Sequence, residues 1–417
     1  MTGCRTATVR DFVLSLPAAK TAGSSTGGEE ILRSYFLDKQ KIFFDTKEET
    51  MSKTTIEQLG EFGQSIWFDY ISRSLLRTGR LNELIGLGVT GMTSNPTIFD
   101  QAINSGSDYD EQIRELKKAE KSVFEIYDDV TIKDIQDAAD AFRPIYERTT
   151  GLDGYVSLEI NPQLAYKTQE TIEEGKRLAK KVNRPNVMFK VPATDEGYGA
   201  IQTLLAAGIN VNSTLIFSLG QYQKTAAAYL AGIKKLLQNK GAARQVRSVA
   251  SVFVSRVDTA VDALLDKLPD AKAAASLKGK AAKANANLIY CAYAQIFAGD
   301  EFKALGKQGA TIQRVLWGST GTKNPAYSDI KYVAELIGKD TVNTVPEKTL
   351  EAFLDHGVVK ETCTADDDEA QEVIDALQKL GIDINNICAQ LLTDGVVAFE
   401  RSFLSLLAAI EKKAKGM

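Results

Sequence analysis

The sequence predicts an α/β fold, a single (β/α)8 TIM barrel with additional helices. From Met51 onward, eight short runs rich in β-branched and aromatic residues alternate with helical segments, an order that favours parallel strands joined by helices. Hydrophobic residues make up 44% of the chain and charged residues 25%, as in ordinary globular domains. The 417 residues suit one barrel, because this fold commonly takes roughly 200 to over 400 residues with insertions.

Each predicted strand is a short apolar run with flanking polar or glycine residues, such as SIWFDYI, YVSLEI and VMFKVPA. In chain order, the predicted strands begin near Ser65, Gly88, Tyr155, Val187, Ile209, Val249, Gln313 and Thr341.

Two intervals between predicted strands are long, and their composition indicates helical insertions near 97–150 and 258–310. Within the second interval, the alanine- and lysine-rich stretch 271–285 favours a solvated helix. From Gly395 to Lys413, apolar residues recur at helical spacing before a basic end, which predicts a C-terminal helix.

Residues 1–50 differ in composition from the rest of the chain. Their first 28 positions are rich in Gly, Ser, Thr and Ala, with Arg5, Arg10 and Lys20 against a lone Asp11. This pattern weakly resembles a transit peptide. We favour the plainer interpretation, an N-terminal extension that is disordered or non-native, and expect residues 51–417 to form one barrel domain.

Charge and residue counts exclude several classes of protein. The net charge of −4 argues against a nucleic-acid partner, and no apolar run approaches the roughly 18 residues of a membrane span. The one histidine, His356, occupies the last turn of a predicted helix closed by Gly357, which indicates a structural role. The four cysteines show no C-x-x-C spacing and suit a reducing compartment, so we expect a cytoplasmic protein.

The glycines of Gly86-Leu-Gly88-Val-Thr-Gly91 have the spacing of a dinucleotide-binding fingerprint. That fingerprint requires a strand before the glycines and a helix after them. Here a helical segment precedes the glycines and a predicted strand runs through them, so we do not expect a nucleotide cofactor at this position.

Lys190 is the most informative residue, because it lies inside the apolar run of the fourth predicted strand. Strand alternation places Lys190 on the opposite face from its apolar neighbours at 187, 189 and 191. An apolar environment disfavours the charged ammonium, and a neutral amine attacks carbonyl groups to form a Schiff base. The segment alone is equally compatible with a lysine at a strand end that extends to water.

Other strands carry polar residues at comparable places and favour the catalytic interpretation. Glu159 interrupts one apolar run, Asp69 interrupts another, and Asn212 shares a strand face with Thr214. Catalytic groups of such barrels gather at the carboxyl ends of the strands. We therefore expect these side chains to meet in one site.

The chain closely resembles the transaldolases of the longer bacterial type, which belong to the class I Schiff-base aldolases. The resemblance extends from about Met51 to the C-terminus, and several stretches follow the order of that family. The most specific stretches are Gly63–Arg73, Thr93–Phe99, Val187–Thr194, Asn212–Ser218 and Trp317–Pro325.

This resemblance implies a metal-independent transferase without a cofactor, which moves a dihydroxyacetone unit between sugar phosphates in the non-oxidative pentose phosphate pathway. Lys190 matches the Schiff-base lysine of the family. Asp69 matches the carboxylate that takes the proton as the carbon–carbon bond breaks. Glu159 and Thr214 match the pair that positions a catalytic water.

The resemblance also implies the residues that bind substrate. Asn95 and Asn212 match residues that hydrogen-bond the sugar, and Ser251 and Arg256 match the phosphate-binding pair. Many members of the family carry a second arginine after strand seven, where this sequence has Lys323. A lysine still binds phosphate as a point charge, although it lacks the bidentate guanidinium.

Alternatives remain at this point. A related Schiff-base aldolase would release free dihydroxyacetone without an acceptor sugar, and a barrel that binds sugar phosphates without catalysis would act as a sensor or scaffold. The sequence is compatible with a monomer or a homodimer.

Overall fold

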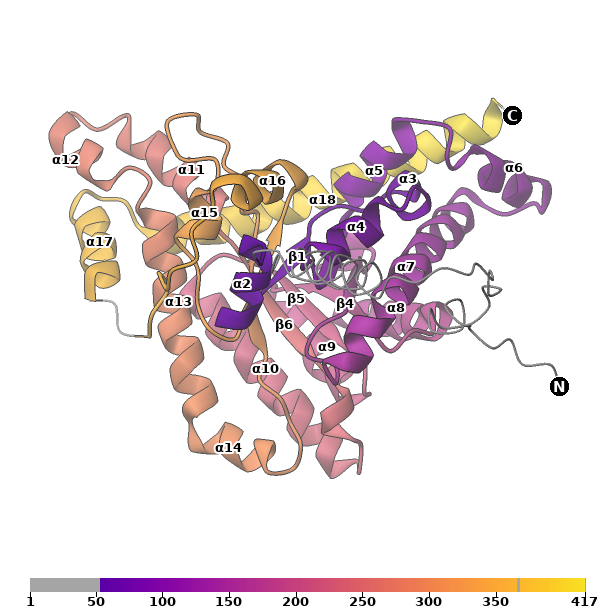
Figure 1. The fold of residues 1–417 in the computed structure, drawn as a ribbon, viewed down its shortest axis with the longest axis horizontal. Helices are drawn as coiled ribbons and strands as arrows, with labels where there is room; N and C mark the ends of the chain where they lie inside the picture. The colour runs from indigo at the N-terminus through magenta and orange to yellow at the C-terminus, as the bar shows by residue number, and fades with distance from the viewer. Residues whose placement is uncertain (1–52, 366–367, 417) are drawn as a thin grey trace, which may run out of the picture. The chain divides into compact units, whose positions relative to one another are not determined.

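The computed structural model describes residues 53–365 and 368–416 (Figure 1). The expected N-terminal extension, residues 1–50, and its targeting alternative lie outside the described residues. Within the described part, no helix is both long enough and apolar enough to cross a membrane.

Eight parallel strands close into a barrel in which each strand pairs with its neighbours in chain order and β8 pairs with β1. The predicted (β/α)8 fold is therefore confirmed. The strands are β1 (Gln64–Phe68), β2 (Gly91–Thr93), β3 (Val156–Glu159), β4 (Val187–Pro192), β5 (Val211–Ile216), β6 (Ser248–Phe253), β7 (Arg314–Gly318) and β8 (Thr341–Val345).

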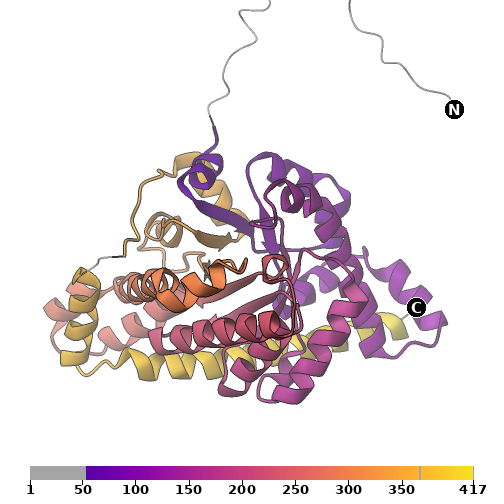
Figure 2. The same ribbon diagram turned by 90° about the horizontal axis from the view of Figure 1, so that it is seen from below.

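Helices follow the strands and surround the barrel (Figures 1 and 2). Several of them follow a Ser, Thr, Asn or Asp whose side chain accepts a hydrogen bond from the first turn, as Ser218 and Asn95 do. The α-helices are α2 (Thr55–Phe62), α3 (Arg73–Arg77), α4 (Arg80–Gly86), α5 (Pro96–Asn104), α6 (Asp110–Lys118), α7 (Val123–Arg148), α8 (Thr168–Val182), α9 (Asp195–Ala206), α10 (Leu219–Gln238), α11 (Ser255–Leu265), α12 (Ala271–Leu277), α13 (Ala281–Ala298), α14 (Asp300–Gly306), α15 (Lys331–Ala334), α16 (Glu347–His356), α17 (Asp368–Lys379) and α18 (Ile384–Lys415), and the short 3-10 helices are η2 (Pro162–Leu164) and η3 (Ala243–Gln245).

The two faces of β4 lie as the alternation predicts. Val187, Phe189 and Val191 belong to the core between the strands and the helices. Met188 points into the barrel, where it packs in a separate cluster with Trp67, Tyr155, Val249, Leu316 and Val342. Lys190 follows Met188 by one pleat, so its side chain lies inside the barrel nearer the carboxyl ends of the strands.

The indole of Trp67 leaves no room for a side chain at Gly91 on the neighbouring strand. A Cβ at position 91 would lie 2.6 Å from the Trp67 nitrogen, closer than real Cβ atoms come. This glycine therefore serves packing inside the barrel. The helix α4 before it and the strand β2 after it confirm that no dinucleotide fingerprint is present there.

The prediction of a solvated helix over 271–285 is wrong. The stretch divides between α12 and α13 at Gly279, which has a left-handed φ of +68°. Ala281, Ala282 and Ala284 are buried, because the start of α13 packs on the core beside β5, β6 and α11. Composition gave the helical propensity of this stretch but not the partner that covers it.

The C-terminal helix is longer than predicted. It begins at Ile384, where the Asp383 side chain accepts hydrogen bonds from the first turn, and Gly395 lies inside it. A Cβ at position 395 would lie 3.0 Å from Leu215 and 3.8 Å from Arg256, so glycine lets α18 approach β5 and α11 closely. Figures 1 and 2 show α18 as a long yellow helix along one side of the barrel.

The predicted end of the helix before Gly357 is confirmed, because α16 ends at His356. The imidazole of His356 is exposed and lies 3.0 Å from an Asp329 oxygen and 3.1 Å from an Asp355 oxygen. Hydrogen bonds to Asp355 and Asp329 raise the pKa of this imidazole above its ordinary value. His356 therefore has a surface role at a helix end, away from the interior of the barrel.

Candidate active site

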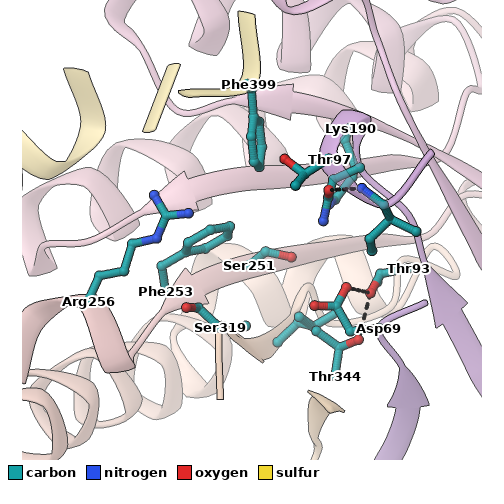
Figure 3. A pocket seen from close by; sticks show the side chains of 14 residues that line it. Asp69, Thr93, Thr97, Lys190, Ser251, Phe253, Arg256, Ser319, Thr344 and Phe399 are labelled. Carbon is teal, nitrogen blue, oxygen red and sulfur yellow. Dashed lines mark hydrogen bonds between the residues drawn. The ribbon is translucent and has the colours of Figure 1, made fainter. Parts of the chain in front are cut away.

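A cavity of about 210 Å³ opens inside the barrel and is lined by Lys190 and by residues at the carboxyl ends of several other strands (Figure 3). Asp69, Asn95, Ser251 and Arg256 also line it. Five of the nine residues expected at the site thus share one cavity, as catalytic groups of such barrels do.

Lys190 is buried inside the barrel, with only 4% of its surface exposed. Its Nζ donates a hydrogen bond to the backbone oxygen of Ser94 at 3.0 Å. The Glu159 carboxylate lies 3.4 Å from the same nitrogen, because Glu159 and Lys190 are register partners on β3 and β4. These contacts exclude the alternative of a lysine that extends to bulk water.

Asp69 follows β1 directly, and its backbone N–H donates to the oxygen of Val345 on β8. Burial raises the pKa of the Asp69 carboxyl, while the Lys190 charge and the Thr93 hydrogen bond lower it. Burial also raises the pKa of Glu159 against the Lys190 charge, and the neighbouring Asp69 raises it further. One amine thus lies among two carboxyl groups whose pKa values are both raised by burial.

Asn212 on β5 is the register partner of Lys190, and its side chain connects β3 to β6. Its Nδ2 donates to the Ser157 hydroxyl at 3.0 Å, and its Oδ1 accepts from the Ser251 hydroxyl at 2.6 Å. This bridge fixes the Ser251 side chain in the wall of the cavity. Asn212 itself does not line the cavity.

Glu159 and Thr214 also lie behind the wall of the cavity. The Thr214 hydroxyl is buried and has no hydrogen-bond partner among the described residues. The Glu159 oxygens are likewise buried, and their closest charged neighbour is Lys190. Buried polar oxygens in this condition suit groups that hold a small polar molecule during a reaction.

Asn95 caps the N-terminus of α5, and its Oδ1 accepts from the backbone N–H of Ile98 at 3.0 Å. This bond holds the side chain at the edge of the cavity, with its amide N–H donors left to bind a ligand. Helix capping therefore gives the residue a fixed orientation at the site.

Arg256 lies at the opposite end of the cavity from Asp69 (Figure 3). β6 ends at Phe253 and α11 begins at Ser255, so Ser251 and Arg256 reach the same cavity from a strand and from a helix. Burial lowers the pKa of the Arg256 guanidinium, which the charge of Asp394 opposes. Its guanidinium carbon lies 5.5 Å from the centre of the Phe253 ring.

Lys323 lies on the exposed loop after β7 and does not line the cavity. Loss of solvent and the positive charge of Arg256 both lower the pKa of its amine. The charges of Arg256 and Lys323 thus act on one another.

Sequence reasoning missed several residues that line the cavity. Thr93 lies within a stretch of the family resemblance but carried no expected role. Thr344 lies in β8 and Ser319 directly follows β7. Which residues of these two strands face the cavity could not be predicted without the pairing register of the strands. Phe399 comes from the middle of α18, and no sequence signal links that helix to the cavity.

Comparison with known proteins places the chain in a family. Residues 66–410 match the family described as transaldolase/fructose-6-phosphate aldolase. The transaldolase of Saccharopolyspora erythraea is 46% identical over 364 residues, covering 87% of this chain and 98% of the relative.

Two further relatives are similar over the same part of the chain. The transaldolase of Mycobacterium ulcerans is 45% identical over 368 residues, which cover 88% of this chain and 98% of the relative. That of Trichodesmium erythraeum is 43% identical over 370 residues, which cover 86% and 97%. With a closed barrel, a buried lysine and a family match across most of its length, the chain belongs to the transaldolase/fructose-6-phosphate aldolase family.

Proposed function

We propose that the enzyme is a transaldolase that transfers a dihydroxyacetone unit through a Schiff base on Lys190. The donor is fructose 6-phosphate or sedoheptulose 7-phosphate, and the acceptor is an aldose phosphate, either erythrose 4-phosphate or glyceraldehyde 3-phosphate. This reaction belongs to the non-oxidative pentose phosphate pathway. The observation that carries the proposal is the buried Lys190 amine, 3.4 Å from Glu159 and in one cavity with Asp69.

The first step joins Lys190 to the ketone carbon of the donor. The ammonium gives a proton to Glu159, and the neutral amine then attacks the carbonyl to form a carbinolamine. Loss of the carbinolamine oxygen as water leaves a protonated Schiff base. Glu159 and the Thr214 hydroxyl are the groups that hold this water and return it when the Schiff base is hydrolysed.

The second step breaks the bond between C3 and C4 of the bound sugar. Asp69 takes the proton of the C4 hydroxyl, the C4 oxygen becomes the carbonyl of the leaving aldose, and the bond electrons move into the Schiff base as an enamine. The acceptor aldose then enters, the enamine carbon attacks its carbonyl, and Asp69 returns the proton. Because the dihydroxyacetone unit stays on Lys190 between the two aldoses, we expect ping-pong kinetics.

The enamine must be protected from water and early release, which requires a closed site. Phe399 extends from α18 toward the cavity between Arg256 and Lys190, and only 4% of its surface is exposed (Figure 3). The ring supplies apolar surface over the cavity without a polar atom that could hold water.

We expect Phe399→Leu to raise the release of free dihydroxyacetone relative to transfer by on the order of tenfold, because the smaller side chain admits water. Release and transfer are measured together from fructose 6-phosphate and erythrose 4-phosphate. Phe403→Leu is the matched control, since Phe403 lies one turn later on α18 and packs against Tyr127. An equal rise in both variants would show a general loosening of the helix and contradict this role.

Arg256 and Lys323 are proposed to bind the phosphate of the donor. Two cations beyond the reacting carbons suit a phosphate dianion, and a guanidinium can bind it with two parallel hydrogen bonds. This binding uses a part of the substrate remote from the reacting carbons to orient them at Lys190.

Arg256→Ala should raise the KM for fructose 6-phosphate by about 10 to 100-fold, the effect expected from the loss of a hydrogen bond between charged groups. Lys323→Ala should have a smaller effect, because Lys323 is exposed and lacks the bidentate group. Steady-state kinetics with fructose 6-phosphate and with unphosphorylated fructose separate phosphate binding from general damage. Equal losses on both sugars would remove Arg256 from the phosphate site, and Arg401→Ala on the exposed face of α18 serves as the control.

An assay with fructose 6-phosphate and erythrose 4-phosphate tests the proposed function. Sedoheptulose 7-phosphate and glyceraldehyde 3-phosphate should form only when the acceptor is present. Equal turnover without an acceptor, with release of free dihydroxyacetone, would assign the enzyme to the aldolases of the same family. A cytoplasmic location is part of this proposal, supported by the scattered cysteine residues, which suit a reducing compartment.

A further inference from the structure

A chain of three oxygen atoms ends at the Asp69 carboxylate. The Thr93 hydroxyl lies 2.6 Å from Asp69 Oδ1 and 2.6 Å from the hydroxyl of Thr344. Dashed lines in Figure 3 join Thr93 to both partners. Both threonines are buried, with 1% and 4% of their surfaces exposed.

The barrel topology explains why these two hydroxyl groups meet. Thr93 ends β2 and Thr344 belongs to β8, and β1 lies between these strands and pairs with both. Asp69 follows the end of β1, so the two threonines reach across it from either side. The backbone oxygen of Thr344 accepts from the Thr320 hydroxyl at 2.8 Å, which ties β8 to the loop after β7.

The protons of the chain have only one consistent direction when Asp69 is ionised. A carboxylate only accepts hydrogen bonds, and each hydroxyl carries one proton. Thr93 must then donate to Asp69, and Thr344 must donate to Thr93. Once Asp69 holds the proton of the sugar hydroxyl, its O–H can donate to Thr93, and Thr93 can donate to Thr344.

The charged groups around Asp69 cannot reverse the direction of their hydrogen bonds when Asp69 changes its protonation state, as the hydroxyl chain can. Lys190 on β4 lowers the pKa of Asp69, while Glu159 on β3 interacts with it as a second carboxyl group. β2 and β8, the strands next to Asp69, contribute the Thr93 and Thr344 hydroxyl groups. The hydroxyl chain can therefore match either protonation state of Asp69 by rotation of two O–H bonds, with no net charge moved.

We propose that Thr344 is a positioning residue that acts through Thr93 to orient and stabilise the ionised Asp69 during carbon–carbon cleavage. The proposal rests on the proposed function, in which Asp69 receives the hydroxyl proton. Thr344 touches neither Asp69 nor the amine through a hydrogen bond, so its influence on the reaction passes through the Thr93 hydroxyl.

Thr344→Val tests this role, because valine has nearly the same shape and lacks the hydroxyl. Without a donor from Thr344, the Thr93 hydroxyl is a weaker and less oriented donor to Asp69. We expect single-turnover cleavage of fructose 6-phosphate to slow about tenfold, as for loss of a hydrogen bond that supports a charge. The ionised carboxylate is the active form, so the acid limb of the cleavage rate should move to higher pH by roughly half a unit or more.

Formation of the borohydride-trapped adduct on Lys190 should change little, because Thr344 acts on the cleavage step. Thr344→Ser, which retains the hydroxyl, should restore both the rate and the acid limb. Thr320→Val is the matched control, because it removes the hydroxyl that binds the backbone of Thr344 and leaves the chain to Asp69 intact. Thermal melting of all three variants separates folding losses from losses of cleavage.

Unchanged cleavage and an unmoved acid limb in folded Thr344→Val would overturn the proposal, as would an equal shift in Thr320→Val. If Thr344→Val fails to fold, Thr344→Ala gives the same comparison without the added methyl group. A wild-type enzyme that traps no adduct from fructose 6-phosphate would instead refute the proposed function, so the two failures are distinguishable.

Discussion

Lys190→Met should lose transfer between fructose 6-phosphate and erythrose 4-phosphate by about 10⁴-fold or more, as expected when the group that forms the covalent intermediate is removed. Methionine keeps the unbranched shape of the buried stem but has no amine to attack the ketone. The Glu159 carboxyl next to it is already buried with a raised pKa, so it can take a proton when its cation is removed. We therefore expect a folded protein without turnover, measured by coupled assay and circular dichroism.

Lys331→Met provides the comparison for this variant. Lys331 is also largely buried and also pairs with a carboxylate, Glu335 at 2.7 Å, but it lies outside the cavity of Lys190. Loss of a buried lysine at position 331 should leave turnover nearly intact. Substantial residual transfer in Lys190→Met, with no borohydride-sensitive adduct elsewhere, would show that the covalent amine is not at position 190.

Asp69→Asn should still form the Schiff base but cleave the bound sugar about 10² to 10⁴-fold more slowly, the usual contribution of a positioned acid or base. The amide retains the size of the carboxyl group and cannot take the hydroxyl proton. Burial raises the pKa of Asp69, and the base form is lost as the pH falls through that pKa. The wild-type cleavage rate should accordingly fall on the acid side, and this limb should be absent in Asp69→Asn.

Rapid mixing with fructose 6-phosphate, followed by borohydride trapping, separates the two steps. The adduct should accumulate in Asp69→Asn with the full hexose attached, because the carbon–carbon bond stays intact. Asp134→Asn removes another buried carboxylate, which pairs with Arg73 outside the cavity, and controls for loss of stability. Cleavage at the wild-type rate in Asp69→Asn would assign the proton transfer to another group.

The sequence alone predicted the barrel and the residues that lie on the opposite strand face from Lys190, because both follow from local periodicity. Alternation along β4 determines which residues share a face, whatever partners the strand has. The positions of Glu159 and Asn212 beside Lys190 then follow from parallel register, in which β3, β4 and β5 align these three residues. Periodicity left open whether this face was the inner one, and the packing of Met188 decides it.

Residues brought to the cavity by tertiary structure could not be predicted in the same way. Phe399 reaches it only because α18 passes close to β5, an approach that Gly395 permits. Thr344 depends on the closure of β8 onto β1, which unites the two ends of the barrel. Neither contact leaves a periodic or spacing signal in the sequence, since both depend on long-range packing.

The division of 271–285 into two helices is a second feature that depends on tertiary contacts and could not be predicted from local sequence. High helix propensity was present throughout this stretch, yet α12 ends at Leu277, before the left-handed Gly279, and the buried start of α13 packs on the core. Intrinsic propensity describes a chain segment without its neighbours, and tertiary contacts set where each helix begins.

Covalent trapping in the wild-type enzyme tests the Schiff-base assignment most directly. The protein is incubated with fructose 6-phosphate, reduced with borohydride and digested, and the modified peptide is identified by mass spectrometry. We expect one dihydroxyacetone-derived adduct on the peptide that contains Lys190, with its amount reduced when erythrose 4-phosphate is added before borohydride. An adduct on any other lysine, or none with an active enzyme, would contradict it.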